Sequence, residues 1–195
     1  MSLGPTVTVR RIRADEWRRV RDLRLEALQD PAAAIAFLDD YESSTAQPDG
    51  FWRRRTAAAA EGETVAQFVA IDGDVWVGSA TGLVREEGSL DHLIRTVEKR
   101  RVDVVGVYVA PGHRGRGAID ALFHGIARWA NELGIDRLTL DVHADNARAQ
   151  AAYRRVGFIE TGTAFTGPIG DELEMVWMPD PGGADVTGPP DSVPA

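Results

Sequence analysis

The sequence predicts a single α/β domain with about seven strands and about four helices. Short apolar runs of strand length alternate along the chain with amphipathic helical patterns. A length of 195 residues with 44% hydrophobic residues suits one domain with a buried core. We expect residues 1–178 to form this domain. Residues 179–195 predict a flexible tail, because a stretch crowded with Pro, Gly and Asp carries too little apolar surface to offset its chain entropy.

The N-terminal half predicts a strand, several helices and a hairpin. Apolar residues alternate with polar ones from Val7 to Ile12, and Asp15 can cap a helix whose apolar residues recur at helical spacing as far as Leu28. A turn at Asp72-Gly73-Asp74 joins two strand-like runs, because glycine tolerates the positive φ that hairpin turns need. The other elements predicted here are a short helical stretch over 31–38, an irregular polar stretch over 39–50, a helix over 51–60, and strands over 65–71 and 75–84.

The C-terminal half carries the clearest patterns. The strongest strand runs over 102–110, and the strongest helix runs over 118–133, with its apolar residues on one face and Gly134 as its stop. Residues 86–100 are charged and ambiguous between one or two helical turns and a loop. The remaining predicted elements are a strand over 138–143, a helix over 147–156 that ends at Gly157, and closing strands over 158–163 and 173–178.

Composition excludes several classes of protein. The chain has no cysteine, which rules out disulfides, thiolate metal sites, iron–sulfur clusters and a cysteine nucleophile. A net charge of −8 argues against nucleic-acid binding. No segment approaches the roughly 20 apolar residues of a membrane helix, and the N-terminus lacks a secretory signal, so we expect a cytoplasmic protein with no membrane partner. The four histidines lack a metal-ligand spacing, and we expect no catalytic metal.

A glycine-rich turn between the strongest strand and the strongest helix predicts an anion site. Arg114-Gly115-Arg116-Gly117 leads directly into the helix, whose first N–H groups and dipole attract negative charge. Glycine lets the backbone approach a phosphate closely, and arginine offers a forked donor. The P-loop pattern fails because Ala118-Ile119 stands where Lys-Ser/Thr belongs, and the dinucleotide fingerprint fails at Asp120. A plain strand-to-helix turn with glycine for geometry is the alternative interpretation.

A second segment follows the strand over 138–143. Asn146 is placed to cap the next helix, and Tyr153 lies seven residues later, two helical turns away, so both side chains can project to one side. Taken separately, Asn146 is more simply explained as a helix cap alone and Tyr153 as a packing residue alone.

Together the two segments resemble the GNAT superfamily of acyl-CoA-dependent N-acetyltransferases. The shared pattern is Arg-Gly-x-Gly opening a helix, then a strand, then Asn-x-x-Ala-x-x-x-Tyr-x-x-x-Gly-Phe from Asn146 to Phe158. The order of elements is similar over Val7 to Met178, and the turn departs from the family pattern at Ile119, where a small residue is usual. The resemblance implies the GNAT fold: a mostly antiparallel mixed sheet that is splayed between its fourth and fifth strands.

The resemblance also implies acetyl-CoA as co-substrate. Its pantetheine arm is expected along Val107, Tyr108 and Val109, and its pyrophosphate on the turn and the start of the helix. Asn146 matches a position that contacts the cofactor, and Tyr153 matches the general acid that protonates the departing thiolate. The cofactor-binding residues implied by the resemblance are Val107, Tyr108, Val109, Arg114, Gly115, Arg116, Gly117, Ala118, Ile119, Asp120 and Asn146.

Acetyl transfer to an amine needs a neutral nitrogen, so a base is the next residue to identify. Forming the neutral amine at pH 7 costs roughly 4–5 kcal/mol for a lysine-like amine with a pKa of about 10.4. The same step costs about 1–1.5 kcal/mol for an α-amine with a pKa near 8. Asp141 is the leading candidate, on the strand that flanks the thioester site. Strand alternation puts His143 on the same face, as a competing or water-linked base. A salt-bridge role for Asp141 is the alternative.

The expected activity is N-acetylation of a primary amine on a small metabolite. Alternatives are acetylation of a protein N-terminus or lysine, a CoA-binding module without catalysis, and nucleotide binding at the glycine-rich turn. Acceptor specificity is expected to come from residues 39–50, 86–101 and 164–171. Asp39, Asp40 and Glu42 can attract a cationic amine, or simply form a solvated face. A homodimer is possible by the same resemblance.

Overall fold

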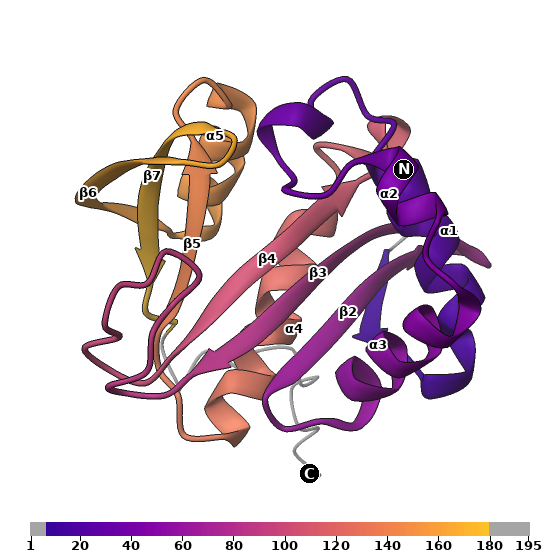
Figure 1. The fold of residues 1–195 in the computed structure, drawn as a ribbon, viewed down its shortest axis with the longest axis horizontal. Helices are drawn as coiled ribbons and strands as arrows, with labels where there is room; N and C mark the ends of the chain where they lie inside the picture. The colour runs from indigo at the N-terminus through magenta and orange to yellow at the C-terminus, as the bar shows by residue number, and fades with distance from the viewer. Residues whose placement is uncertain (1–6, 180–195) are drawn as a thin grey trace, which may run out of the picture.

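The computed structural model describes residues 7–179 and contains one seven-stranded sheet with helices on both faces (Figure 1). The predicted tail therefore lies outside the described residues, apart from its first residue. The strands are β1 (Thr8–Arg11), β2 (Val65–Asp72), β3 (Val75–Arg85), β4 (Arg101–Val109), β5 (Leu138–His143), β6 (Ile159–Gly167) and β7 (Gly170–Trp177). The α-helices are α1 (Trp17–Ala27), α2 (Tyr41–Thr45), α3 (Asp49–Glu61), α4 (Ala118–Glu132) and α5 (Ala147–Val156), with short 3-10 turns at Ala14–Glu16, Ala33–Ile35 and Pro111–His113.

The sheet has the order β1-β2-β3-β4-β5-β7-β6, which confirms the predicted mixed and mostly antiparallel class. Among the described strands, β4 and β5 form the parallel pair, and α4 supplies their crossover. The other neighbouring strands pair antiparallel, so hairpins build both outer parts of the sheet.

Two apolar cores form the layers. One core lies between the sheet and α4. Leu122, Phe123 and Ile126 are fully buried there, so the apolar face that predicted this helix is the face that packs on the sheet. The second core lies on the other face, where α1 and α3 cover β2, β3 and β4. In Figure 1, α4 lies behind the sheet, and α1 and α3 lie in front of it. Among the described residues, no helix has both the length and the apolarity to cross a bilayer.

The splay predicted between the fourth and fifth strands is confirmed. β4 and β5 pair only at Val102–Leu138 and Asp103–Thr139, and the two strands then diverge toward their C-terminal ends (Figure 1). The Thr139 hydroxyl donates a hydrogen bond of 2.7 Å to the Asp103 carboxylate across this short seam. Beyond Asp103, none of the described strands pairs with the β4 edge that faces β5.

A β-bulge in β4 changes which side chains face the opening. The register with β3 shifts by one residue between Ser79–Tyr108 and Thr81–Val105, and Gly106 has a φ of +61° there. Before the bulge, Val104 faces the α4 core; after it, Val109 faces that core and Tyr108 faces the α1 side. One extra residue thus reverses the alternation of the strand.

The structure corrects two local predictions, at residues 41–45 and in the closing strands, and resolves the ambiguous segment 86–100. Residues 41–45 of the stretch predicted to be irregular form α2, because the Asp40 carboxylate caps it by accepting from Ser43 N–H at 2.7 Å, and this makes five α-helices rather than about four. The segment 86–100 forms no helix; it is a loop with a bridge between Leu90 and Thr96. The closing strands are longer than predicted, so most of 164–171 is strand rather than loop.

Candidate functional site

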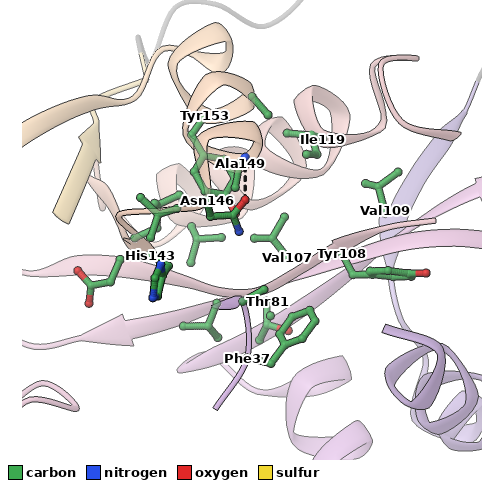
Figure 2. Close-up of a pocket in the computed structure, with 18 of the residues that line it drawn as sticks. Phe37, Thr81, Val107, Tyr108, Val109, Ile119, His143, Asn146, Ala149 and Tyr153 are labelled. Carbon is green, nitrogen blue, oxygen red and sulfur yellow. Dashed lines mark hydrogen bonds between the residues drawn. The ribbon is translucent and has the colours of Figure 1, made fainter. Parts of the chain in front are cut away.

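A cavity of about 790 Å³ lies where β4 and β5 diverge. Figure 2 shows Val107 and Val109 of β4, Ile119 of α4, and Asn146 and Tyr153 of α5 around it. Most of the residues selected from the sequence line this cavity, which brings together segments far apart in the chain. They are Val107, Tyr108, Val109, Arg114, Gly115, Gly117, Ala118, Ile119, Asp141, His143, Asn146 and Tyr153, whereas Arg116 and Asp120 lie outside the lining.

The glycine loop, residues 114–117, forms an open backbone cradle at one end of the cavity. Gly115 and Gly117 have φ values of +73° and +82°, a region that glycine occupies without strain. Apart from the adjoining residues in the chain, no described residue has an atom within 4 Å of where their Cβ atoms would stand. The backbone N–H groups of residues 115–120 donate no hydrogen bond to another described residue. This arrangement at the start of α4 provides donors and a partial positive charge for an anion.

Arg114 is held by the protein itself. Its Nε donates to the Val109 carbonyl at 2.8 Å, and its Nη2 forms an ion pair with the buried carboxylate of Asp30. The guanidinium thus fastens the glycine loop to the end of β4, and its charge is balanced by Asp30. Direct contact of Arg114 with a phosphate stays a prediction, and the structure adds a positioning role that the sequence pattern did not suggest.

The β4 edge runs from the glycine loop to the middle of the cavity. Val107 and Val109 pack toward the α4 core, whereas the Tyr108 hydroxyl donates to Glu26 Oε1 of α1 at 3.0 Å. Burial and this hydrogen bond raise the Tyr108 pKa, so the phenol stays protonated. Because the backbone beyond Asp103 lacks a partner on the β5 side, an extended amide-bearing chain can pair with it as an added strand would.

Asn146 and Tyr153 meet the cavity from α5, as their spacing predicted. The Asn146 side-chain oxygen accepts from Ala149 N–H at 3.2 Å, which makes Asn146 the helix cap and leaves its amide nitrogen toward Val107 (Figure 2). Tyr153 is only 9% exposed and packs edge-on against Phe123. Burial raises the Tyr153 pKa to about 12, so its hydroxyl carries a proton at neutral pH.

Asp141 lies at the other end of the cavity, on the face of β5 away from α5. Burial raises its pKa to about 7, helped by the carboxylates of Glu174 and Glu172 and opposed by Arg95. His92 Nε2 lies 3.4 Å and Arg95 Nη2 3.7 Å from Asp141 Oδ2. A carboxylate that titrates near neutrality beside an imidazole can take up a proton at physiological pH.

His143 shares the Asp141 face, as alternation predicted, but its ring is occupied. Its Nδ1 accepts from Asp145 N–H at 3.1 Å, so the proton of the neutral ring resides on Nε2. Nε2 in turn lies against Gly170, where a Cβ would stand 2.5 Å away. Since neither nitrogen offers a free lone pair to the cavity, this geometry favours Asp141 over His143 as the base.

Several lining residues were not selected from the sequence. His92 comes from the ambiguous loop, which Asp91 shapes by accepting from the N–H groups of Leu93 and Arg95, both at 2.9 Å. Arg148 and Arg155 of α5 also line the cavity, and their spacing of seven residues is a signal for one helix face. His92 had no such signal, because only tertiary packing brings it to Asp141.

The three segments expected to set acceptor specificity differ in what they contribute to the cavity. The loop 86–100 lies across β5 and β7 (Figure 1) and supplies His92. In the segment 39–50, Asp39 pairs with Arg24 at 2.9 Å and Asp40 caps α2, so both carboxylates have partners in the protein. In 164–171, Ile169 at the turn between β6 and β7 reaches the cavity.

Comparisons with known proteins agree with the fold. The model of the acetyltransferase (GNAT) family matches residues 17–158. Over 63 residues the chain is 43% identical to streptothricin acetyltransferase of Streptomyces lavendulae, a match that covers 32% of this chain and 33% of that protein. Over 101 residues it is 27% identical to aminoglycoside N(6')-acetyltransferase type 1 of Salmonella typhimurium, covering 52% of this chain and 67% of that protein.

A solved structure gives the same result at the level of the fold. A GNAT superfamily phosphinothricin acetyltransferase from Sinorhizobium meliloti, in complex with AcCoA, aligns with a TM-score of 0.64 at 20% identity, and the alignment covers 88% of each chain. The sequence matches are shorter: the chain spans about a third of the streptothricin enzyme.

Proposed function

The chain belongs to the GNAT acetyltransferase family, and from this premise we propose that it transfers an acetyl group from acetyl-CoA directly to a primary amine of a small molecule. One observation carries the proposal: the unpaired edge of β4 leads from the glycine loop to a cavity that holds both Tyr153 and Asp141. The relatives named for streptothricin and aminoglycosides favour a small-molecule acceptor.

The residues present fit the co-substrate. Its pyrophosphate is assigned to the free N–H groups of residues 115–120, with Arg116 adding charge. Its pantetheine arm is assigned to the β4 edge at Val107 to Val109, and the Asn146 amide nitrogen supplies a donor from the opposite wall. Ile119 is partly buried against the α4 core, so this departure from the family pattern leaves the N–H groups of the loop open.

Bound acetyl-CoA supplies the thioester carbonyl that the amine attacks. Asp141 takes the proton of the acceptor ammonium, and His92 at 3.4 Å can pass that proton to solvent. As the new C–N bond forms and the C–S bond breaks, Tyr153 gives its hydroxyl proton to the departing sulfur, and the second proton lost from the acylated nitrogen restores the Tyr153 hydroxyl. Tyr153 is suited to this role because burial in an apolar wall keeps it protonated.

The pKa of Asp141 matches the difficulty of the reaction. A carboxyl with its usual pKa near 4 is a weak base toward an ammonium, whereas one that titrates at about 7 is stronger by roughly three powers of ten in affinity for the proton. The absence of cysteine from the sequence separately favours direct transfer to the amine, because an acyl-cysteine intermediate cannot form.

A screen of amines that follows free-thiol release from acetyl-CoA tests this function. The chain contributes no thiol background, because it contains no cysteine. We expect turnover with small primary amines and weaker turnover with peptides that present a lysine or an α-amine. CoA binding without turnover on any amine or peptide would indicate a binding module instead, and ATP binding in place of CoA in calorimetry would indicate a nucleotide site.

A further inference from the structure

Five carboxylates gather on the face of β4, β5 and β7 that the loop 86–100 covers. We call them the acidic face: Asp91, Asp103, Asp141, Glu172 and Glu174. Four of the five have arginine partners within 4 Å. Arg95 contacts Asp91, Asp141 and Glu174, and Arg101 contacts Asp91, Asp103 and Glu174.

Glu172 is the exception on this face. The residue is only 6% exposed and lines the cavity, yet within residues 7–179 its carboxylate has neither a hydrogen bond nor an ion pair. Burial raises its pKa, while His92, His143 and Arg95 act in the opposite direction from a longer range. What remains exposed of this residue borders the cavity, so a cation bound there can pair with a carboxylate that the described residues leave without a partner.

The turn between β6 and β7 leaves room for this side chain. A Cβ on Gly167 would stand 2.1 Å from Glu172 Oε2, and a Cβ on Gly170 would stand 2.5 Å from His143 Nε2. Glycines at both ends of the turn Pro168-Ile169 therefore let Glu172 and His143 occupy the space beside it. Any other residue at position 167 would displace the Glu172 carboxylate.

Glu172 and Asp141 are diagonal neighbours across two strands. Asp141 pairs with Glu174 and His143 pairs with Glu172, so the two cavity carboxylates lie one step apart on the same face. Side chains in such diagonal positions are about 7–8 Å apart. That separation suits one molecule that carries two amines.

We propose that Glu172 binds a second ammonium group of the acceptor, so that the acceptors of this protein are small molecules with two amines a few carbons apart. The inference rests on the proposed function, because it assigns the reacting amine to Asp141. An ammonium beside Glu172 favours the charged form of that carboxyl, which holds the second amine, while Asp141 removes a proton from the first. Paired with the ammonium, the Glu172 carboxylate gains the charge-assisted hydrogen bonds that the protein does not give it.

The test compares cadaverine with pentylamine and aminopentanol, which have the same carbon chain but lack the second amine. We expect kcat/KM for cadaverine to exceed that for either analogue by on the order of tenfold, beyond the statistical advantage of two equivalent amines. Glu172→Gln keeps the shape of the side chain and should abolish this preference. The readout is the ratio of kcat/KM for cadaverine to that for pentylamine, because removing the Glu172 charge also lowers the pKa of Asp141 and so changes both rates. Asp171→Asn, on the opposite face of β7 and outside the cavity, is the matched control and should retain it.

Equal rates for the three amines with wild-type protein, or a cadaverine preference that survives in Glu172→Gln, would overturn the inference. Calorimetry separates this failure from that of the proposed function. Cadaverine should bind the wild-type protein in the presence of CoA and bind Glu172→Gln at least several-fold more weakly, whether or not any amine is acetylated. Undiminished binding to a Glu172→Gln protein with a normal unfolding midpoint also overturns it.

Discussion

The two ends of the cavity are built from different parts of the chain. At the glycine loop, backbone N–H groups of one continuous segment form the site, and the side chain of Arg114 serves to hold that backbone in place. At the acidic face, side chains from β5, β7 and the loop 86–100 form the site together. A backbone site tolerates changes of side chain and leaves a glycine pattern in the sequence. A side-chain site depends on each residue and leaves no local pattern.

The largest effect should come from Tyr153, which lies between the two ends. Tyr153→Phe keeps the edge-on packing against Phe123 and removes only the hydroxyl. We expect kcat to fall on the order of 100- to 1,000-fold, as is typical for the loss of a general acid. CoA affinity, measured by calorimetry, should stay the same. An unchanged rate with every acceptor would show that the acid is another group.

Asp141→Asn should affect the acceptor end alone. We expect kcat/KM to fall about 100-fold at pH 7. The wild-type value should rise as pH increases through about 7, because Asp141 must lose its proton to act as a base. The defect should shrink at high pH, where the amine is already neutral. His143→Gln is the control: a pH profile that loses its rise near 7 in this variant, and keeps it in Asp141→Asn, would reassign the base.

Gly117→Ala tests the backbone nature of the cofactor end. The φ of +82° strains an alanine by about 1–2 kcal/mol, which shifts the N–H groups that face the anion. We expect CoA to bind roughly tenfold more weakly. Gly134→Ala, at the other end of α4, has a φ of +71° and equally open surroundings. It should lose similar stability in thermal unfolding and bind CoA normally, so equal binding defects in both variants would point to general destabilisation.

The smallest effect should come from Arg116→Gln. Arg116 is exposed and lies outside the cavity lining, so its charge acts at long range through solvent. We expect CoA to bind only a few-fold more weakly, with the difference vanishing at high ionic strength. Arg128→Gln, exposed farther along α4, is the control. A large loss of affinity that salt does not remove would mean that Arg116 makes a direct contact and that side chains matter at this end too.

Much of the fold followed from the sequence because its signals are local. The face of α4, the stop at Gly134 and the turn at Gly73 depend on neighbouring residues, and the structure has each of them. The capping position of Asn146 was predicted for the same reason. The loop 86–100 was ambiguous because its shape comes from Asp91, whose partners include Arg101 in another element.

The site residues also divide into those marked by a local sequence pattern and those brought to the cavity only by tertiary packing. The glycine loop, Asn146 and Tyr153 were found from two short patterns. Asp141 was chosen because the resemblance places its strand beside the thioester site, and strand alternation then added His143. His92 and Glu172 were missed because nothing in their neighbours along the chain marks them. For Arg114, the sequence pattern selected the residue but could not predict its partners. Only the structure shows that Asp30 and Val109 hold its side chain.

The bulge at Gly106 has a consequence for how this protein can change over generations. Removing one residue near it would swap the faces of Val107, Tyr108 and Val109, so deletions in this part of β4 should be eliminated by selection. The bridge in the loop 86–100 joins two of its own residues, Leu90 and Thr96, so this loop can change in length without altering strand register. New acceptor preferences can therefore evolve in that loop while the groove for the acyl donor is inherited intact.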